Sequence, residues 1–116
     1  MSKMKLSDNT ILEKVLQNIK QLEEFVADTT TFEKFSADEK TKHACTMVLI
    51  NIGELLSHLS DGFKNSHPEL PHAKATGLRN VAAHGYHRLK FEFIWETINK
   101  SIPELKKQIE KLLKEK

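Results

Sequence analysis

An arginine, a histidine and a tyrosine lie within eight consecutive residues of this chain, Arg79-Asn80-Val81-Ala82-Ala83-His84-Gly85-Tyr86. The guanidinium of arginine stays protonated and can bind two phosphate oxygens at once. A histidine imidazole titrates near ~6.5, so it can accept or donate a proton at cellular pH. This combination of groups is suited to breaking a phosphodiester bond of RNA without a metal ion.

The spacing of Arg79 and His84 limits how the two side chains can meet. Five residues along a helix rotate by about 140° and rise about 7.5 Å, so the pair cannot share one face of a regular helix. They can converge if His84 lies at the helix end beside Gly85, or across a two-fold axis with the equivalent pair of a second subunit. Taken singly, Arg79 could form a surface ion pair and His84 could bond to carbonyls at a helix end.

Hydrophobic periodicity predicts an all-α fold, an up-and-down bundle of four to five helices that positions this segment. One helix is expected from the start signal Ser7-Asp8 to near Asp28, and another over about 38–59. A shorter helix over about 73–84 would end at Gly85. Two further apolar faces follow at helical spacing: Phe91, Ile94, Trp95 and Ile98, then Leu105, Ile109, Leu112 and Leu113.

The connections between these helices have their own signals. Thr29-Thr30-Thr31 favours a turn or an extended link, after which Phe32 and Phe35 are expected to pack back onto the core. Residues 60–71 contain one glycine and two prolines and indicate an ordered connection. Ser101-Ile102-Pro103-Glu104 has the form of a capping box, so either a fifth helix starts there or a kinked one continues.

The composition fits a single domain over residues 1–116, because 39% hydrophobic content in 116 residues would leave two domains without adequate cores. The chain has no apolar run of about 18 residues and turns polar at Ser7, so we expect no membrane span, no secretory signal and a cytoplasmic location. Cys45 is the only cysteine and lies in an apolar stretch, so we expect a buried hydrophobe rather than a reactive thiol.

The helix expected over 38–59 is apolar around most of its circumference, so it should be buried on more than one side. A second subunit could cover the remaining face, and we expect a homodimer. Asn51 and Glu54 interrupt this helix at positions i and i+3 and therefore share a face. That face looks either into the functional site or into solvent.

The positive charge of the chain is concentrated around the motif. The net charge is only +2, yet residues 61–90 hold five Lys and Arg against two acidic residues, with four of the six histidines. Those histidines lack the His-Glu-x-x-His spacing of a zinc site, and the four glycines are isolated. We therefore expect no metal and no nucleotide cofactor, while the charge alone fits a solvated loop as well as an RNA-binding segment.

Several landmarks beside the motif follow one order along about half of the chain, and the chain thereby resembles the HepT-like toxins of the HEPN ribonuclease superfamily. The landmarks are Asn51-Ile52-Gly53-Glu54-Leu55, His67-Pro68-Glu69-Leu70-Pro71, Gly77-Leu78-Arg79-Asn80 through Tyr86, Trp95, and Pro103-Glu104-Leu105. The chain departs from the family pattern at His72, where tryptophan is frequent, and at Leu78, where methionine is common. Neither departure touches the arginine, histidine or tyrosine.

The resemblance implies a metal-independent endoribonuclease whose cleft forms between two subunits from both copies of Arg79, His84 and Tyr86. The ribose 2′-hydroxyl would attack its own 3′-phosphate, with His84 moving a proton and Arg79 stabilising the phosphoryl oxygens. Asn80 matches the usual Arg-Asn pair and would position the arginine or a phosphate; otherwise it bonds within the turn. Asn51 and Glu54 are expected to support the site.

Tyr86 has a second role in this family. HepT-like toxins are encoded with a minimal nucleotidyltransferase antitoxin of the MntA type, which attaches AMP to the motif tyrosine. The resemblance therefore implies that AMP on Tyr86 brings negative charge and bulk into the RNA site and blocks it; the structural alternative is a tyrosine ring packed over a helix end. The competing hypothesis for function is a non-catalytic helical partner that binds substrate for a nucleotidyltransferase.

Overall fold

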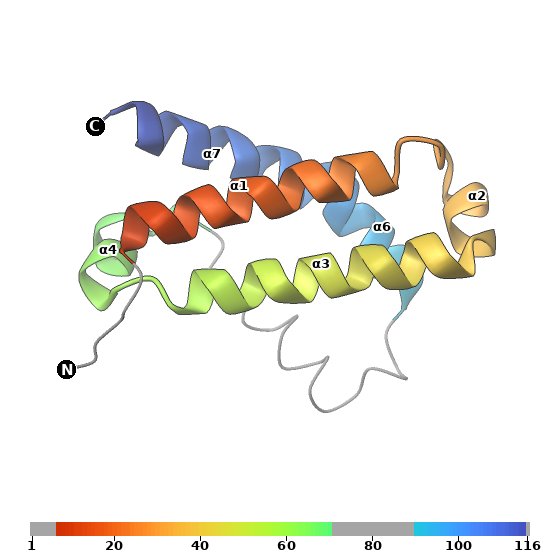
Figure 1. Ribbon diagram of the computed structural model, residues 1–116, viewed down its shortest axis with the longest axis horizontal. Helices are drawn as coiled ribbons and strands as arrows, with labels where there is room; N and C mark the ends of the chain where they lie inside the picture. The colour runs from red at the N-terminus through yellow and green to blue at the C-terminus, as the bar shows by residue number, and fades with distance from the viewer. Residues whose placement is uncertain (1–6, 71–89, 116) are drawn as a thin grey trace.

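The computed structural model describes residues 7–70 and 90–115, and within them it contains helices and no strand (Figure 1). The prediction of an all-α fold is confirmed. In chain order the elements are α1 (Asp8–Phe25), α2 (Phe32–Ala37), α3 (Glu39–Ser57), α4 (Asp61–Ser66), α6 (Phe91–Glu96), the π-helical turn η2 (Thr97–Ser101) and α7 (Ile102–Lys114). The bundle is made by α1, by α3 and by the continuous stretch of α6, η2 and α7. The helix expected over 73–84 lies outside the described residues.

Two polar contacts between helix ends define the up-and-down order of the bundle. At one end, Asp8 accepts hydrogen bonds from the backbone N–H of Ser60 (2.8 Å) and from its hydroxyl (2.7 Å), which joins the start of α1 to the end of α3. At the other end, the Lys106 ammonium of α7 lies 2.9 Å from the Glu23 carboxylate near the end of α1. Helix α1 therefore runs antiparallel to both α3 and α7 (Figure 1).

The core lies between these three helices and is built from the predicted apolar positions. Its buried members from the N-terminal half are Ile11, Leu12, Val15, Ile19, Leu22, Phe35, Cys45, Val48, Leu49, Ile52, Leu56 and Leu59, and those that follow are Leu70, Ile94, Ile98, Ile102, Leu105 and Ile109. Burial raises the pKa of the Cys45 thiol to about 11, so the thiolate that would react is scarce at neutral pH. The prediction that Cys45 is an inert core residue is confirmed.

Helix α1 begins where the sequence predicts, because the Ser7 hydroxyl accepts a hydrogen bond from the backbone N–H of Thr10 (3.1 Å). Helix α3 begins in the same way at Asp38, whose carboxylate accepts from the backbone N–H (2.9 Å) and the hydroxyl (2.8 Å) of Thr41. These hydrogen bonds lower the pKa of Asp38, since they favour its charged form. Asp38 is therefore a helix cap, as its place in the sequence indicates.

Two stretches that the sequence analysis assigned to connections contain short helices. Phe32 and Phe35 lie in α2, which starts at a hydrogen bond from the Lys34 N–H to the Thr31 hydroxyl (3.2 Å). Phe35 is fully buried, as expected, with its ring 5.0 Å from that of Trp95. The connection over 60–71 contains α4 in the same way. Each helix is about one and a half turns long, too short for periodicity to reveal.

The capping-box prediction at Ser101 is wrong. Ser101 has helical backbone angles (φ −73°, ψ −41°) and makes no capping hydrogen bond through its side chain. The helix continues through η2, where the Ile102 N–H donates to the Thr97 carbonyl five residues back. The wider π turn accommodates Pro103, which lacks an N–H and crowds the preceding turn. Burial of Ile98 and Ile102 on one face favours this kinked continuation, the alternative that the sequence left open.

None of the helices within residues 7–70 and 90–115 is long and apolar enough to cross a membrane.

Candidate functional site

The four residues of the predicted motif, Arg79, Asn80, His84 and Tyr86, fall in the segment 71–89, outside the described residues. What the structure describes is how the chain is held on either side of that segment. We call these two places the upstream anchor, formed around Leu70, and the downstream anchor, formed around Phe91.

The upstream anchor comprises His67, Glu69 and Leu70, which follow α4. The His67 ring stacks on Phe63 with centroids 4.3 Å apart, and its Nδ1 lies 3.1 Å from the Phe63 carbonyl oxygen. The Glu69 carbonyl accepts a hydrogen bond from the Gln108 side-chain amide of α7 (3.3 Å). Leu70 is 2% exposed within the core. Residues 67–70 are therefore held between α4 and α7.

The downstream anchor comprises Phe91 at the start of α6 and two residues from the first turns of α3. The ammonium of Lys42 lies 4.7 Å from the centroid of the Phe91 ring, which is a cation–π contact. The His43 ring meets the same ring edge-on, with centroids 5.4 Å apart and planes at 83°. The first turn of α6 after the motif segment is thus held against the N-terminal end of α3.

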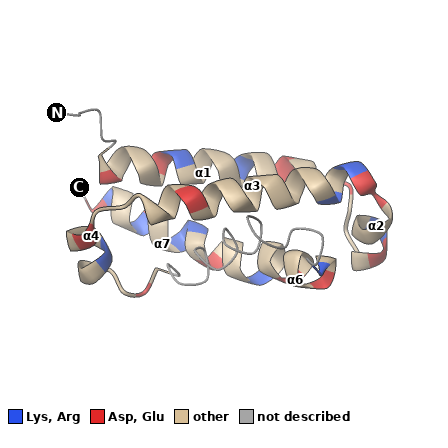
Figure 2. Ribbon diagram, turned by 90° about the horizontal axis from the view of Figure 1, so that it is seen from below, with Lys and Arg blue, Asp and Glu red and all other residues tan. Residues whose placement is uncertain are grey.

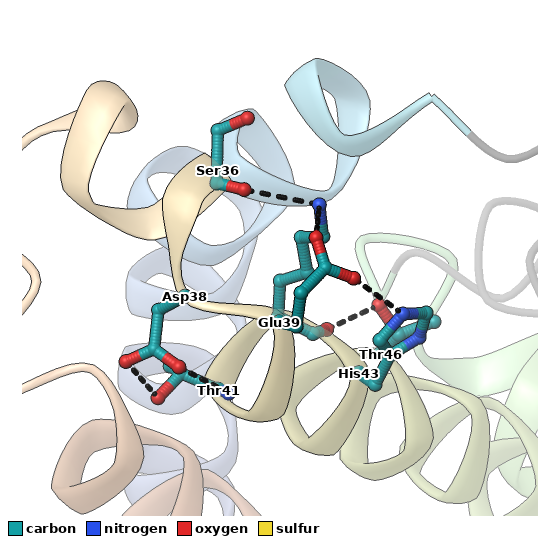
Figure 3. A network of polar contacts seen from close by, with 7 residues as sticks. Ser36, Asp38, Glu39, Thr41, His43 and Thr46 are labelled. Carbon is teal, nitrogen blue, oxygen red and sulfur yellow. Dashed lines mark hydrogen bonds and ion pairs between the residues drawn. The ribbon is translucent and has the colours of Figure 1, made fainter.

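A network of polar contacts holds the α3 residues of the downstream anchor (Figure 3). Lys42 donates to the Ser36 carbonyl (3.0 Å) and lies 2.8 Å from the Glu39 carboxylate. The same carboxylate lies 3.5 Å from Nε2 of His43, and the Thr46 hydroxyl donates to the Lys42 carbonyl (2.8 Å). The nearby ammonium of Lys42 is the main reason that the pKa of Glu39 is lowered. The network fixes the positive charge beside Phe91.

Asn51 and Glu54 occupy neighbouring positions on α3, as their spacing predicts. The Asn51 amide donates to the side-chain oxygen of Asn18 on α1 (2.9 Å), so this exposed asparagine links two helices. Glu54 lies 2.8 Å from Nε2 of His58, one turn further along α3, and its side chain is 45% exposed. Because the motif lies outside the described residues, a role of either residue in the site stays a prediction.

A groove of ≈ 510 Å³ lies beside the upstream anchor. It was not predicted from the sequence. Its lining comes from the turn after α4 and from one face of α7: His67, Glu69, Glu104, Lys107, Gln108, Lys111, Leu112 and Glu115. Both signs of charge occur along α7, as Figure 2 shows, so the groove does not present a positive surface to phosphates. Glu104, Lys107, Lys111 and Glu115 are spaced so that they share one face of α7. This spacing is the signal from which the polar lining of the groove could have been predicted.

Within the described part of the chain, no group of three or more His, Cys, Asp or Glu side chains could hold a metal ion. The contact between Lys42 and Phe91 was not predicted from the sequence. They are far apart in the sequence, and neither belongs to a recognisable motif. The one hint in the sequence that Phe91 matters was its position five residues after Tyr86.

Comparison with known proteins relates the chain to ribonucleases. The model of the family described as "Ribonuclease HepT-like" matches residues 15–112. A protein of Thermococcus cleftensis named "Probable ribonuclease HepT" is 35% identical over 111 residues, which cover 96% of this chain and 100% of the relative. No solved structure matches the chain.

Two further relatives are named as candidate RNases. One, from Methanocaldococcus jannaschii, is 33% identical over 101 residues, covering 87% of this chain and 83% of the relative. The other, from Caldanaerobacter subterraneus, is 36% identical over 102 residues, covering 88% of this chain and 90% of the relative. Each alignment covers most of both chains, so the similarity concerns the domain as a whole.

Proposed function

Because the chain belongs to the HepT-like ribonuclease family, we propose that it is the toxin of a toxin–antitoxin pair and cuts RNA without a metal ion. Family membership makes the chain an RNase of the HEPN type; the mechanism, the residues and the cellular role are the proposal. The observation that carries it is the extent of the family match, because residues 15–112 include the whole segment from Arg79 to Tyr86.

The proposed reaction uses the nucleophile that RNA itself contains. The 2′-hydroxyl oxygen forms a bond to the adjacent phosphorus, and the bond from phosphorus to the 5′-oxygen of the next nucleotide breaks. His84 removes the 2′-hydroxyl proton or delivers a proton to the leaving oxygen, and Arg79 stabilises the charge on the phosphoryl oxygens. The products are a 2′,3′-cyclic phosphate and a 5′-hydroxyl, and no water molecule is consumed in this step.

Three polar residues support this site in the proposal. Asn80 orients Arg79 or a phosphate of the substrate, while Asn51 and Glu54 contribute from the face of α3 that they share. The contact of Asn51 with Asn18 holds that face in a fixed orientation relative to α1 (2.9 Å). Hydrogen-bonded side chains around catalytic groups reduce the number of orientations that those groups can take.

The active form in this proposal is a homodimer whose two-fold axis passes through the cleft. The spacing of Arg79 and His84 leaves two arrangements open, within one chain at a helix end or across a two-fold axis, and the resemblance to HEPN ribonucleases favours the second. Met47, near the middle of α3, supports an interface on that helix, because a large apolar side chain 59% exposed is a suitable contact for another subunit.

The proposed reaction predicts that the purified protein cleaves RNA in the presence of EDTA. Incubation of total RNA with the wild-type protein should give new ends that carry a 2′,3′-cyclic phosphate and a 5′-hydroxyl. Ligation of the 3′ ends before and after removal of the cyclic phosphate, and of the 5′ ends before and after phosphorylation, identifies both. Cleavage that requires added magnesium, or ends that carry a 5′-phosphate, would contradict the mechanism.

The proposed partner is a minimal nucleotidyltransferase of the MntA type, which transfers AMP to the hydroxyl of Tyr86. In that step the tyrosine oxygen attacks the α-phosphate of ATP, and pyrophosphate leaves. The product carries a negative phosphodiester two residues from His84, in a site that binds RNA phosphates, so repulsion and bulk should prevent RNA from binding.

Co-expression with the nucleotidyltransferase should therefore increase the intact mass of the protein by whole AMP units and abolish RNA cleavage. Tyr86→Phe should remove the increment, because phenylalanine has no hydroxyl to modify, and should leave the protein active in the presence of the partner. Tyr86 is the only tyrosine in the chain, so fragment masses assign the modified residue without ambiguity. An unchanged mass after co-expression would contradict the proposed transfer of AMP to Tyr86.

A further inference from the structure

We draw no further inference here: the strongest candidate, the groove of ≈ 510 Å³ between the turn after α4 and one face of α7, is lined by side chains of both charges, and nothing in the structure shows which ligand or partner would occupy it.

Discussion

Replacing His84 with alanine is expected to lower the rate of RNA cleavage by about 10²–10⁴-fold, the usual contribution of a general acid or base. The imidazole is the group in the motif that can both accept and donate a proton near neutral pH, whereas Arg79 stays charged throughout. The measurement is the single-turnover rate on a defined RNA in EDTA, with the helical content checked by circular dichroism.

The matched control for this variant is His87→Ala. His87 lies three residues further along the same segment and is not part of the Arg-x4-His-x-Tyr set. It should retain most of the wild-type rate, because it has no proposed part in the proton transfer. A His84→Ala protein with more than half of the wild-type rate would show that another group moves the proton, and equal losses in both variants would point to damage to the segment as a whole.

Mixing two inactive variants, Arg79→Ala and His84→Ala, is expected to restore RNA cleavage if the cleft combines residues of two subunits. A mixed dimer contains one wild-type arginine and one wild-type histidine on different chains. If these meet across the two-fold axis, one of the two positions is complete. Random exchange of subunits makes half of the dimers mixed, so about a quarter of the wild-type activity should return.

This experiment distinguishes the two arrangements that the spacing of Arg79 and His84 leaves open. If His84 and Arg79 meet within one chain, no chain in the mixture has both residues, and activity stays at the level of the separate variants. The result is informative only if subunits exchange between dimers, so that mixed dimers form. Co-expression of two differently tagged chains, followed by purification on both tags, supplies mixed dimers directly and also tests the dimer itself.

The structure describes the chain on both sides of the segment that contains the motif. Before that segment Leu70 is buried, and after it Phe91 contacts Lys42 and His43. These anchors involve α4 with α7 on one side and α3 with α6 on the other.

Features that depend on contacts between residues close together in the sequence could be predicted from the sequence. The helix starts at Ser7 and Asp38 were predictable, because a capping side chain bonds to a backbone N–H three residues away. Burial of Cys45 followed from apolar neighbours at helical spacing. The motif from Arg79 to Tyr86 is visible in the sequence as residue types in a given order, and its role in catalysis stays a prediction.

Tertiary structure decided the features that depend on residues distant in the sequence. The signal at Ser101 was overruled, because the chain stays helical through η2 into α7 with Ile98 and Ile102 buried in the core. Lys42 and Phe91 are 49 positions apart, and no local pattern connects them. Residue order thus determined the helices and the chemical groups, whereas packing between helices determined the kink and the anchors, because only folding brings those partners within reach.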